Sequence, residues 1–189
     1  ASDLAALERQ LDAEDCSAVL VEIVQGEGGV RALDADYLKA VEALCHEKNV
    51  LFCVDEVQTG NGRTGTWFAY EQFGLSPDLV STAKGLGNGL PIGATLMGSK
   101  TAEVLTPGTH GSTFGGNPVA CAGALSVLEQ IDDAFLEAVK QKGAWLTAEL
   151  EKIPGVKDVS GLGLMLGFSV EGCKSADIKA KALDNGLVV

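Results

Sequence analysis

The sequence predicts an α/β fold built around a mostly parallel sheet. Two apolar runs rich in Val and Ile, residues 17–24 and 49–55, are typical of buried strands. Between them, residues 34–46 place apolar side chains at helical spacing after Asp34, a common helix N-cap. Strand, helix and strand in this order form a right-handed βαβ unit, in which the two strands run parallel.

The next segments extend this sheet. Residues 56–76 form a Gly-rich loop with a short amphipathic stretch, and residues 77–84 and 92–99 are two further apolar runs of strand length. Residues 2–15, before the first strand, have the pattern of an acidic helix. In such a sheet, ligands bind beyond the carboxyl ends of the strands.

The last third of the chain has a different pattern. Asn117 and Pro118 predict a helix N-terminus, and a second helix is predicted from about Ala134 to Ile153. We predict one strand over 161–170 and a helix over 175–185. We therefore divide the chain into a first domain (1–115), a connecting helix (116–132) and the beginning of a second domain (133–189). Because it stops one step into an apolar strand, we expect it to be part of a longer protein.

Composition excludes several classes of partner. The formal net charge is −12, from 14 basic and 26 acidic residues, so neither nucleic acid nor an anionic membrane is an expected partner. The longest apolar run is far shorter than a membrane span. Five widely spaced cysteines without a Cys-x-x-Cys pair, and first residues without a signal-peptide pattern, indicate reduced thiols in a cytoplasmic protein.

Two charged residues end neighbouring apolar runs. Asp55 follows "VLFCV", and Lys84 follows "DLVSTA" and precedes glycines. Pyridoxal phosphate enzymes need such a pair, because a lysine amine condenses with the cofactor aldehyde and a carboxylate keeps the pyridine nitrogen protonated. Each residue alone has a simpler interpretation. Lys84 is also typical of a solvated strand end or a phosphate contact, and Asp55 of a cap or metal ligand.

Longer stretches carry a family resemblance. "VEIVQGEGGV", "LFCVDEVQTGNGRTGTWFAYEQFGLSPDLVSTAKGLGNGLPIGA" and "HGSTFGGNPVACAGALSVLE" resemble the class III aminotransferases, which are fold-type I pyridoxal phosphate enzymes. Within that class the sequence of these stretches is most similar to the acetylornithine type. One departure is Ile23, where the family usually has proline. The resemblance implies part of a large cofactor-binding domain followed by the start of a small C-terminal α+β domain.

The same resemblance implies roles for residues around the cofactor ring. Lys84 is expected to bind pyridoxal 5'-phosphate covalently and to move protons, and Asp55 to pair with the pyridine nitrogen. Val57 is expected to pack on a face of the ring and Gln58 to hydrogen-bond near the ring hydroxyl. No metal is expected.

Three further residues are expected to act across a dimer or on the substrate. Ser112 and Thr113 are implied to bind the cofactor phosphate of the neighbouring subunit, although turn hydroxyls have the same pattern. Glu27 is implied to pair with a substrate-binding arginine, although a solvated loop acid is the simpler interpretation. Arg63 is interpreted as a loop anchor that satisfies carbonyl groups, with an anion contact as the alternative.

The implied reaction moves the terminal amino group of N-acetylornithine to 2-oxoglutarate, a step of arginine biosynthesis. Related 4-aminobutyrate, ornithine and succinylornithine aminotransferases stay open as alternatives. So does a non-catalytic phosphate-binding α/β domain, although no Gly-x-x-x-x-Gly-Lys-Ser/Thr loop occurs. The family's other phosphate loop and its substrate arginines are expected outside residues 1–189, so we expect this chain alone to be inactive.

Overall fold

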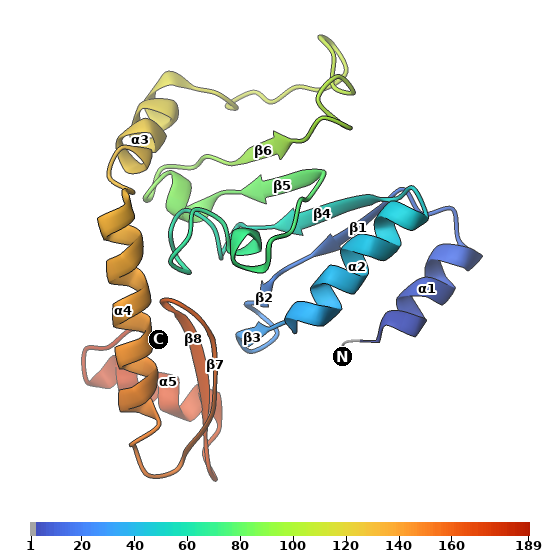
Figure 1. The fold of residues 1–189 in the computed structure, drawn as a ribbon. Coiled ribbons are helices and arrows are strands. Elements are labelled where there is room, and N and C mark those ends of the chain that lie inside the picture. Colours follow the sequence, from blue (N-terminus) through green and yellow to red (C-terminus); the bar gives the residue numbers. More distant parts are fainter. Residues whose placement is uncertain (1–2) are drawn as a thin grey trace.

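A four-stranded sheet organises the first half of the chain in the computed structural model, which describes residues 3–189 (Figure 1). Its order is β1-β4-β5-β6, with bounds Ala18–Val21, Leu51–Asp55, Leu79–Thr82 and Ala94–Met97. Strands β1, β4 and β5 run parallel, and β6 is antiparallel to β5. The predicted α/β fold with a mostly parallel sheet is therefore confirmed.

Helix α2 (Ala35–Glu47) covers one face of this sheet beside α1 (Leu4–Ala13). Asp34 caps α2, since its Oδ1 accepts from the backbone N–H groups of Asp36 and Tyr37, both at 3.0 Å. The helix and sheet share a core whose main side chains are fully buried: Leu38, Val41, Cys45, Phe52 and Val54. Burying each large apolar side chain contributes about 1.5–3 kcal/mol, so this core holds β4 against α2.

The prediction of one strand over 17–24 is wrong. Strand β1 ends at Val21, and β2 (Val24–Gln25) pairs antiparallel with β3 (Arg31–Ala32). The chain reverses between them because Gly29 adopts a left-handed φ of 97° and its N–H donates to the Gly26 carbonyl at 3.2 Å. Ile23 lies at the break, fully buried, and its carbonyl accepts from Leu33 N at 2.9 Å.

The prediction of a single strand over 161–170 is also wrong. This region belongs to an antiparallel hairpin of β7 (Val156–Leu162) and β8 (Met165–Val170). The hairpin turns at Gly163, whose φ is 54°. A Cβ there would lie 2.6 Å from backbone atoms of Thr64. Only glycine therefore lets the turn approach this closely to the segment after β4, residues 56–74, which we call the 56–74 loop.

The remaining helices follow the predicted order. They are α3 (Pro118–Leu128), α4 (Asp133–Leu150) and α5 (Ser175–Asp184), with short 3₁₀ turns η1 (Ala69–Phe73) and η2 (Lys84–Leu86). Asn117 caps α3 through Ala120 N at 2.9 Å. Figure 1 shows α4 running from the sheet to the β7–β8 hairpin. Within 3–189, no helix combines the length and apolar character of a membrane span, and all five cysteines are free thiols.

Candidate active site

Asp55 and Lys84 lie at the same edge of the sheet. Asp55 is the last residue of β4 and pairs in register with Ser81 of the neighbouring parallel strand β5. Lys84 follows the end of β5 and opens η2. The fold therefore brings an amine and a carboxylate to adjacent strand ends, where ligands of α/β sheets bind.

Hydrogen bonds fix the orientation of the Asp55 carboxylate. Its Oδ1 accepts from Val57 N at 2.9 Å and from Ser81 Oγ at 3.1 Å. Its Oδ2 has no hydrogen-bond partner within residues 3–189. One oxygen thus holds the group in place and the other is left to accept a proton donor from a ligand.

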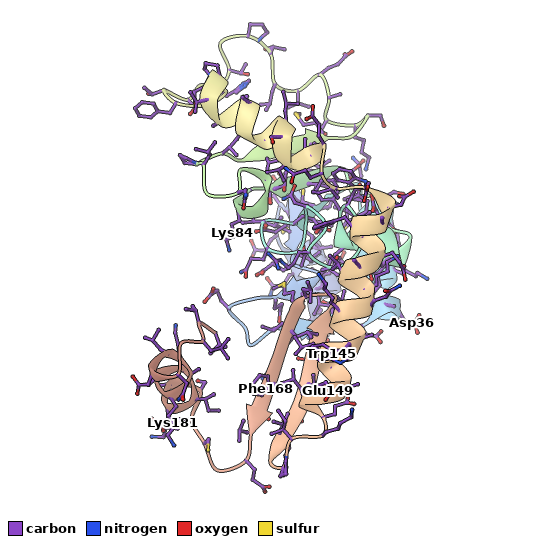
Figure 2. The ribbon with its side chains drawn as sticks, turned by 90° about the vertical axis from the view of Figure 1, so that its left-hand side faces the viewer. Asp36, Lys84, Trp145, Glu149, Phe168 and Lys181 are labelled. Carbon is purple, nitrogen blue, oxygen red and sulfur yellow. The ribbon has the colours of Figure 1, made fainter. Side chains whose placement is uncertain are left out.

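Lys84 is held by its backbone rather than by its side chain. Its φ is 44°, a left-handed value that costs a non-glycine residue about 1–3 kcal/mol, and residues with such strain cluster at active sites. The side chain is exposed, and it forms no ion pair within the described part of the chain. Figure 2 shows it at the edge of the fold, above the β7–β8 hairpin.

Asn61 connects the two strand ends, a contact the sequence analysis missed. Its Nδ2 donates to Thr82 Oγ1 at 2.8 Å and to the Ala83 carbonyl at 3.3 Å. Asn61 has a φ of 56°, and asparagine tolerates this conformation better than most residues. The sequence feature that could have indicated this conformation is the position of Asn61 between two glycines. This amide ties the loop after Asp55 to the turn that carries Lys84.

A cavity of about 380 Å³ gathers four of the seven predicted site residues. Glu27, Val57, Gln58 and Lys84 line it together with Arg63 and residues 164–166 of the hairpin. Gln58 lies directly against the chain at Gly26, where a Cβ would come within 2.3 Å of its Nε2. The Gln58 side chain therefore packs against the backbone at Gly26 within this cavity.

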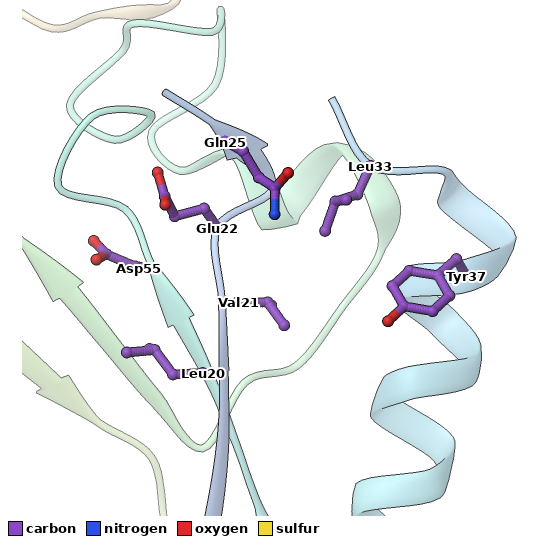
Figure 3. A pocket seen from close by; sticks show the side chains of 7 residues that line it. All are labelled: Leu20, Val21, Glu22, Gln25, Leu33, Tyr37 and Asp55. Atoms are coloured by element: carbon purple, nitrogen blue, oxygen red, sulfur yellow. The ribbon is translucent and has the colours of Figure 1, made fainter. Parts of the chain in front are cut away.

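Asp55 lines a neighbouring cavity of about 270 Å³ (Figure 3). Figure 3 shows its carboxyl group and that of Glu22 on the same side of β1 as the Leu20 side chain. Gln25 and Asp55 line this cavity. Gly26, Glu27 and Val57 line the larger cavity that contains Lys84. The two cavities therefore flank the same two segments, 25–27 and 55–57.

Ser112 and Thr113 lie apart from Lys84 in this chain. Both are exposed on the loop between β6 and α3, and neither lines the two cavities described above. Ser112 Oγ accepts from Gly115 N at 2.9 Å, a local turn contact. A role for them at a cofactor requires a site contributed by another chain.

Glu56 is a fully buried acid between Asp55 and Val57. Its Oε1 accepts from Tyr70 N at 2.9 Å, and its Oε2 accepts a short hydrogen bond from Thr59 Oγ1. Burial raises the pKa of this carboxyl, and these hydrogen bonds only partly oppose the shift. Glu56 thereby connects both ends of the 56–74 loop, which carries three of the cavity residues.

We expect the Glu56→Gln variant to gain stability relative to the wild type as the pH rises. Because the pKa of Glu56 is raised in the folded state, its contribution to the free energy of unfolding is fully present below the ordinary carboxyl pKa of about 4.3. That contribution is lost as the pH rises through the raised pKa. Urea unfolding of both proteins between pH 4 and pH 8 measures the difference in free energy of unfolding. A difference that does not change with pH would contradict the assignment.

The sequence matches the model of one protein family, "Aminotransferase class-III", over residues 1–189. The chain belongs to the class-III aminotransferase family. Curated relatives include the acetylornithine aminotransferase of Haemophilus ducreyi, 50% identical over 189 residues, and that of Bacillus subtilis, 49% identical over 179 residues. They match 100% and 93% of this aminotransferase chain. The chain spans only 48% and 46% of these relatives' own lengths.

Solved structures of aminotransferases share the fold. An ornithine aminotransferase from Toxoplasma gondii, with partial occupancy of PLP at its active site, superimposes with a TM-score of 0.90 at 37% identity. An acetylornithine aminotransferase from Elizabethkingia anophelis gives 0.88, also at 37% identity. These matches cover 100% and 99% of this chain, and 46% and 50% of the solved chains. The structure is thus a fold-type I aminotransferase fragment.

Proposed function

We propose that this chain forms the lysine-bearing half of a pyridoxal phosphate-dependent aminotransferase of the acetylornithine type. The observation that carries the proposal is the pair at the sheet edge. Asp55 has one carboxylate oxygen fixed and one without a partner in the described chain, and Lys84 presents an exposed amine at the next strand end. Family membership supports the same chemistry.

The residues present fit this cofactor. Lys84 lines a cavity together with Gln58, whose amide can donate and accept hydrogen bonds, and with the apolar side chain of Val57. The free Oδ2 of Asp55 suits a protonated ring nitrogen, because an adjacent carboxylate stabilises a cationic ring. When bound, pyridoxal phosphate supplies an electron-withdrawing ring that stabilises negative charge on the substrate carbon.

Each side chain then has a defined role. Lys84 holds the cofactor and moves a proton to and from the reacting carbon of the substrate, a general acid–base role. When the cofactor is bound, Asp55 would keep the ring nitrogen protonated, Gln58 would orient the ring, and Val57 would pack against it. Glu27 is proposed to pair with a substrate-binding arginine. Its exposed position in the Lys84 cavity supports this assignment.

The substrates we propose are N-acetylornithine and 2-oxoglutarate, within arginine biosynthesis. Support comes from the curated relatives, which carry the name acetylornithine aminotransferase at 43–50% identity. The likeness to solved ornithine aminotransferases favours ornithine as a second candidate donor. Assaying the full-length protein with each donor and 2-oxoglutarate separates the two, and a preference for ornithine would overturn the first choice.

We also propose a cytoplasmic homodimer in which the subunits share active sites. Ser112 and Thr113 lie on a loop that extends beyond the sheet (Figure 1), so they can bind phosphate in a second subunit. Exposed apolar side chains on this loop and on α3 support its burial by another chain: Val104, Leu105, Phe114, Val119 and Leu125. We keep residues 1–115, 116–132 and 133–189 as the proposed domain division.

We expect the 189-residue chain alone to lack aminotransferase activity and to bind the cofactor weakly. Tight binding needs several phosphate donors, and Ser112 and Thr113 lie away from Lys84 in this chain. Orienting the substrate supplies several kcal/mol of the barrier, and half of the aligned relatives' length is outside this chain. Cofactor titration and turnover are measured for this chain beside the full-length protein. Equal affinity and turnover would contradict the prediction.

A further inference from the structure

Arg63 shares the cavity of Lys84, and its side chain has no role in holding the loop. Within residues 3–189 the guanidinium forms no ion pair, not even with Glu27 in the same cavity. No hydrogen bond joins it to a loop carbonyl either; the 56–74 loop is held by Asn61, Glu56 and Gln72. The expectation that Arg63 anchors its loop by satisfying carbonyl groups is therefore wrong.

The backbone of Arg63 is nevertheless fixed. Its carbonyl accepts from Leu164 N in the hairpin turn at 3.0 Å, and its N–H donates to the Gly60 carbonyl at 3.3 Å. The close approach of Gly163 to Thr64 locks the same contact. The loop and hairpin thus present a positioned arginine at the cavity, and the guanidinium is left free to bind something else.

The charge of the cavity favours an anion. Its lining has two cationic groups, Lys84 and Arg63, and one acid, Glu27, whereas the chain as a whole has 14 basic and 26 acidic residues. Once Lys84 carries the cofactor, Arg63 is the cation of this cavity that stays available. A guanidinium has a planar set of donors that matches a carboxylate in two parallel hydrogen bonds.

We propose that Arg63 is a specificity residue that binds a carboxylate group of the substrate. The inference rests on the proposed aminotransferase function and adds a substrate-binding arginine within this chain. The exposed guanidinium of Arg63 reaches solvent, so a substrate entering the cavity meets it. The neighbouring Gln58 and Glu27 bind other parts of the same complex under this assignment.

The test uses the full-length protein with Arg63→Ala and Arg63→Lys, and Arg31→Ala as a control for an exposed arginine outside this cavity. Single-turnover kcat/KM is measured with N-acetylornithine, with 2-oxoglutarate and with n-butylamine, which has no carboxylate. Losing a hydrogen bond to a charged group weakens binding about tenfold to hundredfold. We expect a loss of that size with at least one carboxylate substrate in Arg63→Ala, a smaller loss in Arg63→Lys, and n-butylamine within about twofold of the wild type.

Several outcomes would overturn the inference. Unchanged constants for both carboxylate substrates would remove the assigned contact, and an equal loss with n-butylamine would mean a general structural role. Weaker cofactor binding with unchanged substrate constants would place the guanidinium on the cofactor phosphate instead. The wild-type protein is measured before any variant. If it shows no turnover, or carries its cofactor on another lysine, the proposed function itself is refuted.

Discussion

Replacing Lys84 with alanine in the full-length protein is expected to remove the covalently bound cofactor and to lower turnover by several orders of magnitude. We expect a large loss because, in the proposed function, one amine both holds the cofactor and moves the proton at the reacting carbon. Lys84 forms no ion pair within residues 3–189, so its loss leaves no buried partner unsatisfied. Visible absorbance of the purified protein and steady-state turnover measure the two effects.

A matched control separates this effect from loss of any exposed lysine. Lys100 is also exposed and lies shortly after β6, where it forms an ion pair with Asp78 at 3.6 Å. Surface ion pairs contribute about 0–1 kcal/mol, so Lys100→Ala is expected to keep its absorbance and its turnover. Retained absorbance in Lys84→Ala, or its loss in Lys100→Ala, would mean that Lys84 is not the attachment site.

The second large effect is expected at Asp55. Asp55→Ala and Asp55→Asn are expected to bind the cofactor but to slow turnover by about 10²–10⁴-fold, since a preorganised charge at the ring is lost. Asn keeps an oxygen for the hydrogen bonds from Val57 N and Ser81 Oγ but carries no negative charge. Single-turnover rates with the amino donor measure the loss directly.

Ser81→Ala gives the control for Asp55. It removes only the 3.1 Å hydrogen bond that orients the carboxylate, and such a bond contributes about 0.5–1.5 kcal/mol. We therefore expect a loss of about tenfold or less. If Asp55→Asn were as active as the wild type, the charge of Asp55 would have no part in the reaction.

The sheet could be predicted because its signals are local. The run 49–55 is apolar up to Asp55, and the run 77–84 has Leu79 and Val80 shortly before Lys84. Strands β4 and β5 and their carboxyl ends could therefore be predicted directly. Breaks inside apolar runs could not be predicted this way. The apolar run 17–24 continues past the end of β1, because Ile23 is buried outside that strand. The chain turns at Gly163, inside the apolar run 161–170, because Thr64, nearly 100 residues earlier in the sequence, lies against it.

The site could be predicted in part for the same reason. Lys84 and Gln58 stand in distinctive local sequences, and they line one cavity together with Glu27. Asn61, Glu56 and Arg63 have roles that depend on contacts with distant segments: Thr82, Tyr70 and Leu164. Ser112 and Thr113 lie outside both cavities in a single chain, and no pattern in one chain shows what a second subunit adds.

The proposal that Lys84 binds the cofactor covalently is tested most directly by finding which lysine carries the cofactor. The full-length protein is reduced with borohydride, which makes the link to pyridoxal phosphate permanent, and is then digested and mapped by mass spectrometry. We predict that the label lies on the peptide that contains Lys84, at stoichiometry near one per chain. A label on Lys39, Lys48 or Lys100, or no label at saturating cofactor, would contradict the account.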